Sequence, residues 1–169
     1  MTRLRVPRGS RPTGDSGQAL VEFTLVAPFF FLLLFGIIEA GRFIVYYETL
    51  SNAAREGARY AIVHGSNSFC PSGPMPPGKT PPAGCYDATG ANVEQRVKDS
   101  AFGMLGSAVS VVKCWGTIES DNTCTDSGLG NGREAPVSVR ASYTYRTLVP
   151  LVPLPAITVN GESTLVINN

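Results

Sequence analysis

The feature that most constrains this sequence is an uncharged apolar run from Phe23 to Ile38, FTLVAPFFFLLLFGII. With the residues in front of it, this run forms a 21-residue segment, 18–38. At about 1.5 Å per residue, a helix of that length spans roughly 30 Å, the thickness of the hydrocarbon core of a bilayer. The alternative is a buried core helix, but a chain of 169 residues could hardly cover so many large side chains on all sides. We therefore predict a transmembrane helix over 18–38.

The charges are distributed unevenly around this segment. The whole chain has a net charge of +1, so no field attracts nucleic acid and we expect no nucleic-acid partner. Residues 1–17 are polar and rich in Gly and Pro, and they hold four arginines against Asp15 alone. Such a segment cannot bury a core and is expected to be disordered. Because basic residues favour the cytoplasmic side of a membrane helix, residues 1–17 are predicted to be cytoplasmic and the C-terminal domain extracytoplasmic.

The helix is predicted to continue outside the membrane over 39–64. The sequence lacks proline there and carries an apolar stripe at helical spacing. The second half of the stripe consists of small residues, among them Ala54, Gly57 and Ala58. Small residues allow close backbone approach, either to the sheet of the same chain or to a neighbouring subunit.

Beyond the helix, the sequence predicts a Pro-rich loop over 65–91 and an α+β domain over 92–169. Prolines recur through the loop, which favours extended surface conformations. A short amphipathic helix is expected from Asn92 to Leu105, with Asn92 as its cap. The β-rich segment 109–119 is expected to be the first strand.

The C-terminal part of the domain predicts further strands. Strict alternation over 137–147 is typical of a half-buried antiparallel strand. A final strand or hairpin is expected over 157–167, with Asn160 and Gly161 as a candidate tight turn. The predicted fold class is α+β: a long N-terminal helix, transmembrane in its first half, followed by a small antiparallel β-sheet domain with one additional helix.

Four cysteines follow the apolar segment, and none lies in a C-x-x-C pair. An even number, wide spacing and Gly/Pro-rich surroundings favour disulfides in an oxidising compartment, with unpaired thiols or metal ligands as the alternative. Among the three possible pairings we favour the sequential one, which would close the Pro-rich loop and the segment after the first strand. These pairs are Cys70–Cys85 and Cys114–Cys124.

The junction between the leader and the apolar helix holds a candidate cleavage site, Gly17–Gln18. An ordinary secretory signal places its apolar region before the cleavage site, whereas here Gly17 precedes it. A cut after Gly17 at the cytoplasmic face would leave the helix as the mature N-terminus, with a new amino group on Gln18. Glu22 would lie one turn from that end, where it could pair with the amine of a neighbouring subunit. The alternative is that Glu22 only extends to the membrane interface.

The residues Gly17, Glu22 and Phe23 resemble the prepilin peptidase recognition pattern, and they look like the pseudopilins of the tight-adherence (Tad/Flp) pilus system. The likeness continues through GQALVEFTLVAPFFFLLLFGIIEAGR and NAAREGARYA, so that 17–61 resembles the TadE-like family. The resemblance implies a pilin-like fold and a minor pilin or pseudopilin of the bacterial inner membrane, active in pilus biogenesis and surface adhesion. The implied partners are a prepilin peptidase, other pilins or pseudopilins, the pilus assembly machinery and the lipid bilayer.

No pattern in the sequence indicates an enzyme or a cofactor. The only histidine, His64, has no nucleophile motif around it, and phosphate-binding and zinc signatures are missing. Asp121, Asn122 and Asp126 form an oxygen-rich loop, but their spacing does not fit an EF-hand, so we expect solvated loop residues and no metal site. The competing functions are an uncleaved single-pass receptor or scaffold, which would need neither Gly17 nor Glu22, and a membrane-anchored hydrolase, which nothing in the sequence supports.

Overall fold

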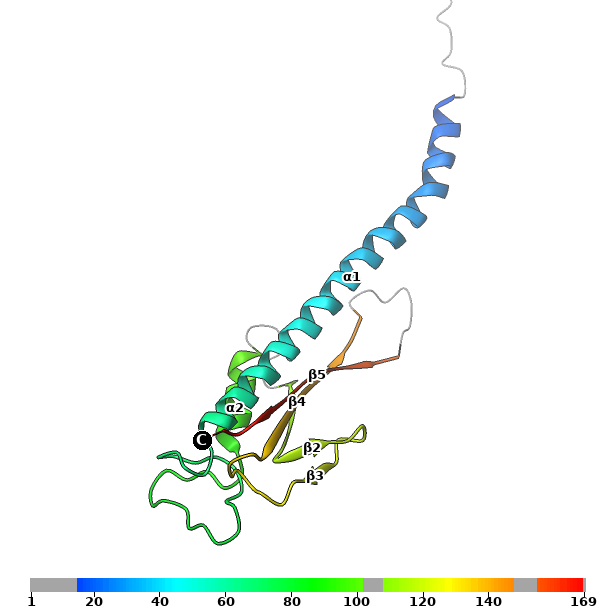
Figure 1. Cartoon of the computed structure of the whole chain (residues 1–169). Helices are drawn as coiled ribbons and strands as arrows, with labels where there is room; N and C mark the ends of the chain where they lie inside the picture. Colours follow the sequence, from blue (N-terminus) through cyan, green and yellow to red (C-terminus); the bar gives the residue numbers. More distant parts are fainter. Residues whose placement is uncertain (1–14, 102–107, 148–154, 169) are drawn as a thin grey trace, which may run out of the picture. The chain divides into compact units, whose positions relative to one another are not determined.

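The computed structural model describes residues 15–101, 108–147 and 155–168, and it has the predicted α+β fold (Figure 1). The chain forms two compact units, Met1–Ala40 and Gly41–Asn169. Most of the predicted leader lies outside the described residues. The predicted end of the second helix, at Leu105, also lies outside them.

The first helix, α1, extends from Asp15 to Val63. Within the part of the chain that the structure describes, the segment Gly17–Val63 is the one helix long and apolar enough to cross a membrane. Its most apolar window has a mean hydropathy of 2.3, and no residue of that window is buried in the protein. A run of large exposed apolar side chains needs an apolar solvent, so α1 indicates membrane anchoring.

The second unit is built on a three-stranded antiparallel sheet in the order β1-β4-β5. Its strands are β1 (Ser110–Cys114), β4 (Pro136–Tyr145) and β5 (Ile157–Val166). A separate two-stranded hairpin consists of β2 (Gly116–Ile118) and β3 (Cys124–Asp126). The predicted first strand is therefore interrupted, because β1 ends at Cys114 and the chain turns into the hairpin.

The part of α1 that belongs to the second unit packs on this sheet through its small residues. Ala54 and Ala58 are fully buried, and a Cβ added to Gly57 would overlap the side chain of Val97 and approach Val139 of β4. Of the two predicted partners for the small-residue stripe, the sheet of the same chain is confirmed. The shared core holds Tyr46, Leu50, Ala53, Ala54, Ala58, Ala61, Val93, Val97, Ala101, Val109, Trp115, Ala135, Val137, Val139, Ala141, Tyr145, Val159 and Ile167.

Of the two alternatives predicted for 157–167, the single strand is confirmed and the tight turn at Asn160 and Gly161 is wrong, because both residues lie inside the continuous strand β5. Gly161 pairs with Ala141 of β4, and a Cβ on it would overlap the backbone of Leu50 in α1. A glycine inside a strand often marks the close approach of another backbone. Here Gly161 leaves room for the backbone of α1. The sequence alone does not show whether such a glycine marks a turn or a close approach of another element.

The prediction that β4 is buried on one face only is also wrong. Ser138 and Arg140, on the face away from α1, are both buried. The β2–β3 hairpin covers them: the Ser138 hydroxyl donates to the Gly116 carbonyl at 2.7 Å, and the Arg140 guanidinium donates to the Glu119 carbonyl at 2.7 Å. Arg140 also forms an ion pair with Glu162 of β5 at 2.7 Å.

The second helix, α2, extends from Ala91 to Ser100 and lies beside α1 (Figure 1). Asn92 is not its cap, since it lies within the helix. The first N–H groups are satisfied by the carboxylate of Asp87, which accepts from the backbone of Ala91 at 3.0 Å and of Asn92 at 2.8 Å. Burial alone would raise the pKa of Asp87, but these bonds and that from the Ser72 hydroxyl outweigh it and lower the pKa below its usual value.

Glu94 ties α2 to the sheet. Its carboxylate receives hydrogen bonds from Lys113 of β1 and from Lys98 one turn further along α2. The bond from Lys113, followed by that from Lys98, lowers the pKa of Glu94 to about 2. The ionised carboxylate is therefore the form that the folded state favours.

We expect Gly161→Ala to destabilise the protein by about 1–3 kcal/mol, because the added methyl group would force α1 away from β5. Thermal unfolding of the full-length protein in detergent measures the effect. The control is Gly41→Ala, the same change in the helix at a site with nothing within 4 Å of the new Cβ. It should be neutral or stabilise by about 0.5–1 kcal/mol, because alanine is the better helix former. Equal effects of the two changes would contradict this role of Gly161.

We expect Glu94→Gln to destabilise the protein at pH 7 by about 0.5–1 kcal/mol, which is modest because the ion pairs are partly exposed. A carboxylate with a lowered pKa contributes stability above its ordinary pKa of 4.5 and loses it as the pH falls towards about 2. The melting temperatures of the two proteins should therefore converge between these values. A difference in melting temperature that stays constant between pH 4.5 and about 2 would contradict the stabilising role of the ionised Glu94 carboxylate.

Candidate functional site

The predicted processing and assembly residues lie on the first turns of α1. Gln18, Glu22 and Phe23 are exposed, and Gly17 has nothing within 4 Å of the position where a Cβ would stand. Glu22 follows Gln18 by one helical turn, so the two side chains share a face of the helix. The structure thus places the carboxylate next to the residue that would carry the new amine after a cut at Gly17.

A shallow recess runs along this same face of α1. It is lined by Gly17, Gln18, Val21, Glu22, Leu25 and Val26. Glu22 is the one charged residue among those lining the recess. Gly17 and Gln18 both lie inside α1, so the candidate bond is helical in this structure.

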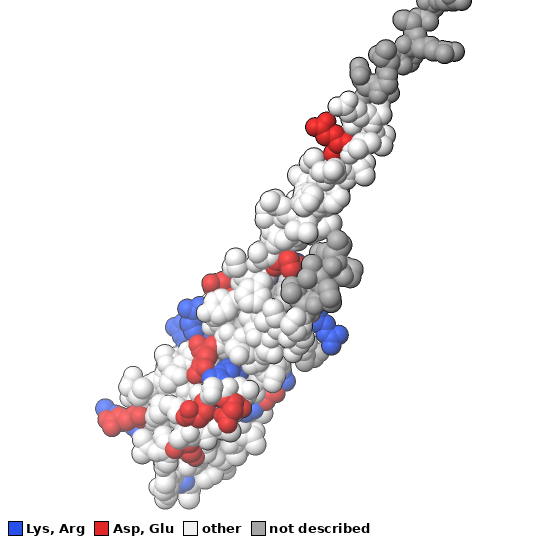
Figure 2. Space-filling model, turned by 90° about the vertical axis from the view of Figure 1, so that its right-hand side faces the viewer, with Lys and Arg blue, Asp and Glu red and all other residues white. Residues whose placement is uncertain are grey.

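The environment of Glu22 is apolar. Figure 2 shows the charged side chains gathered on the second unit, whereas the described surface of the first unit is largely uncharged on this face. Over residues 17–38, Glu22 is the only Asp, Glu, Lys or Arg. A lone carboxylate among exposed apolar side chains needs a cationic or hydrogen-bonding partner if it enters a membrane.

The second unit contains both sequential disulfides. Cys70 pairs with Cys85, with 5.1 Å between the Cα atoms, and Cys114 pairs with Cys124, with 5.5 Å between them. The first closes the Pro-rich loop, as the sequence led us to expect. The second joins the end of β1 to the start of β3 and so fixes the hairpin that covers Arg140.

The Pro-rich loop is attached to the sheet through Trp115. Its ring fills the space that side chains would occupy at Gly73 in the loop and Gly90 before α2. Asn131, which is fully buried, donates to the Ser72 carbonyl at 3.2 Å, and its backbone N–H donates to the Pro74 carbonyl at 2.6 Å. The loop therefore has a fixed inner side, while Phe69 projects from it with 88% of its surface exposed.

The other polar candidates have structural partners. The ring of His64 stacks on that of Tyr60 at a centroid distance of 3.9 Å. Asp121 accepts two hydrogen bonds from Thr123, and these lower the pKa of its carboxyl below the usual value. Asp126 accepts from the Gly128 backbone at 2.9 Å. Among the residues that the structure describes, no group of three or more His, Cys, Asp or Glu side chains could hold a metal ion.

Asp87, Arg140 and Glu162 are structurally important residues whose roles the sequence did not predict. Asp87 had a usable signal, since an acidic residue shortly before a helix satisfies its first N–H groups. Arg140 and Glu162 had none, because their ion pair depends on the pairing of β4 with β5, which places them directly opposite each other.

The chain thus combines an apolar helix that carries a Gly-x-x-x-x-Glu-Phe segment near its start with a small α+β unit after it. A family model described as TadE-like protein matches residues 17–59. The resemblance to the TadE-like family is therefore confirmed over these residues, which include Gly17, Gln18, Glu22 and Phe23. The matched residues all lie within α1. No curated protein and no solved structure matches the chain.

Proposed function

We propose that this protein is a minor pilin or pseudopilin of a tight-adherence pilus, processed by a prepilin peptidase and required for pilus biogenesis and surface adhesion. The observation that carries the proposal is the coincidence of three features in one segment. The TadE-like match, the exposed first turns of α1 and the lone carboxylate Glu22 all fall within residues 17–59.

The proposed processing step follows from the position of Gly17. The peptidase would hydrolyse the bond between Gly17 and Gln18, releasing residues 1–17 on the cytoplasmic side. The mature chain would keep α1 as its membrane anchor, with residues 39–64 and the α+β domain on the extracytoplasmic side. The arginines of the leader support this orientation, and the two disulfides fit an oxidising compartment.

The proposed assembly step uses Glu22. A carboxylate in hydrocarbon is costly, and an ion pair with a free amine lowers that cost. When a subunit leaves the bilayer to join others, the amine of one Gln18 and the carboxylate of a neighbouring Glu22 can pair in one axial register only. The pair would then select the register while apolar contacts supply most of the stabilisation.

The mature protein is expected to begin at Gln18, because the polar, Arg-rich leader ends at Gly17, directly before the apolar segment. Intact-mass analysis of protein extracted from membranes of cells that contain the peptidase measures this. A catalytically inactive peptidase provides the control, in which residues 1–17 should be retained. Retention in both strains would contradict processing and would favour the uncleaved receptor or scaffold.

Glu22→Ala and Glu22→Gln are both expected to be cleaved and inserted normally but to abolish most pilus assembly and adherence. The reason is that each removes the charge that pairs with the new amine, and the glutamine variant keeps the shape. The measurements are the mass of the membrane-bound subunit and the amount of surface pili.

The matched control is Glu48→Gln, which removes an exposed carboxylate from the same helix outside the apolar run. It should assemble normally. Normal pili from both Glu22 variants would show that the carboxylate only reaches the interface, and the proposed register selection would fail.

A further inference from the structure

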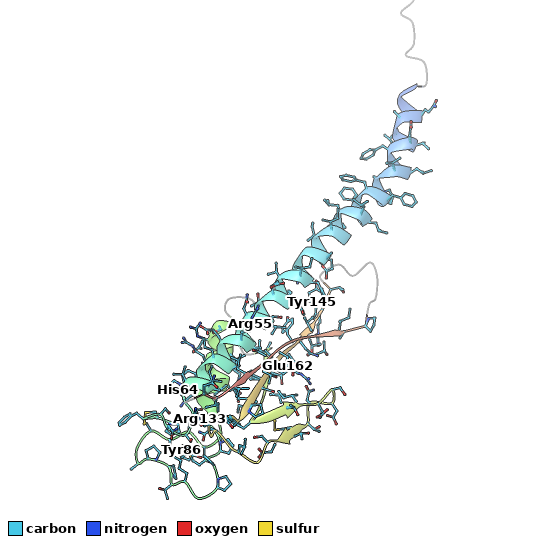
Figure 3. All side chains as sticks on the ribbon, in the orientation of Figure 1. Arg55, His64, Tyr86, Arg133, Tyr145 and Glu162 are labelled. Carbon is cyan, nitrogen blue, oxygen red and sulfur yellow. A yellow bond between two sulfur atoms is a disulfide. The ribbon has the colours of Figure 1, made fainter. Side chains whose placement is uncertain are left out.

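The second unit has an aromatic surface at one end of its sheet. The rings of Tyr46 and Tyr143 stack at 5.2 Å, and Tyr145 makes edge-on contacts with Tyr46 at 5.4 Å and Phe43 at 5.7 Å. Figure 3 labels Tyr145 at one end of this unit and Tyr86 towards the other. The name aromatic end is used for this group and its neighbours in the chain and the sheet: Phe43, Tyr46, Tyr143, Tyr145, Ile157, which pairs with Tyr145, and Tyr47, which follows Tyr46 on α1 and is exposed.

The aromatic end is only partly covered by the protein. Tyr145 is buried, but Phe43, Tyr47 and Ile157 on its rim expose between 38% and 49% of their surface. These residues come from α1 and from β5, so the exposed patch is not a continuation of one apolar helix face. Ile157 pairs directly with Tyr145 across the sheet, which connects the two elements.

Two arginines belong to the same end. The guanidinium carbon of Arg42 lies 5.5 Å from the centroid of the Tyr145 ring and 5.8 Å from that of Tyr46. Arg146, the residue after Tyr145, is exposed. Tyrosine rings beside arginines are the composition that proteins use at the boundary between hydrocarbon and lipid phosphates, where the ring has an apolar body and a polar tip.

The position of this surface in the chain indicates whether it contacts lipid headgroups or a second copy of the chain. Arg42 and Phe43 follow the apolar run, which ends at Ile38, by four and five residues. A membrane that contains the run must therefore lie within about 10 Å of these residues, given a helical rise of about 1.5 Å per residue. A surface held so close to a bilayer meets lipid headgroups at a far higher concentration than any other partner.

We propose that the aromatic end is a lipid-docking surface, which seats Ile157 and the exposed tyrosine Tyr47 in the headgroup region while Arg42 and Arg146 contact lipid phosphates. The globular unit is then held on the membrane through β5 as well as through its helix. This inference depends on membrane anchoring and is independent of pilus assembly.

The test places a tryptophan on each end of β5. Ile157→Trp reports from the aromatic end, and Val166→Trp reports from a site of matched exposure, 46% against 43%, about 30 Å further along the strand. The full-length protein is reconstituted in vesicles of phosphatidylethanolamine and phosphatidylglycerol, with and without lipids brominated in the upper acyl chain. The native Trp115 is buried in the core, so the unsubstituted protein supplies the background emission.

We expect bromolipid to quench the Ile157→Trp signal strongly and to leave the Val166→Trp signal at background, since an interfacial side chain enters the boundary by about 5–10 Å. Adding Arg146→Gln to Ile157→Trp should weaken the quenching. Equal quenching at the two ends of β5 would overturn the proposal. An emission shift that depends on protein concentration and not on bromolipid would also overturn it, in favour of a second copy of the chain as the occupant. Unchanged quenching in the Arg146→Gln variant would show that Arg146 does not contribute to lipid binding.

Discussion

The second unit depends on the approach of one helix backbone to one strand backbone. Gly161 of β5 lies so close to Leu50 of α1 that no side chain fits between them, and Gly57 of α1 makes room for Val97 and Val139 in the same way. Dispersion forces act over short distances, so small residues on both elements allow a dense contact over the length of the helix. The larger core side chains, such as Leu50 and Val159, then fill the space on either side.

This contact explains why the small-residue stripe could be found in the sequence while its partner could not. Ala54, Gly57 and Ala58 recur at helical spacing, which indicates a closely packed helix face. Whether the opposing surface belongs to the same chain depends on Gly161, more than a hundred residues away. Asn-Gly is the commonest signal for a tight hairpin, so the local rule predicted a turn where the tertiary structure needed a glycine for space.

The first half of α1 was predictable for a simpler physical reason. Hydrocarbon can solvate large apolar side chains on every side of a helix, so the run from Phe23 to Ile38 needs no information about the rest of the chain. The burial of the outer face of β4, in contrast, could not be predicted from the sequence. Arg140 alternates with apolar residues as a solvent-facing residue would, and only the β2–β3 hairpin and Glu162 make its burial possible. A polar residue in an alternating strand predicts its face, but not whether another element covers that face.

Both disulfides close local loops, with sequence separations of 15 and 10 residues, and every cysteine of the chain is used in them. Neither bond connects α1 to the sheet. A force that pulls the sheet away from α1 is therefore resisted first by the non-covalent contacts along the line of small residues, before the backbone that joins the two elements becomes taut. The helix and sheet can therefore separate under tension while the loop and the hairpin keep their shapes, and the same contact can re-form when the tension is released.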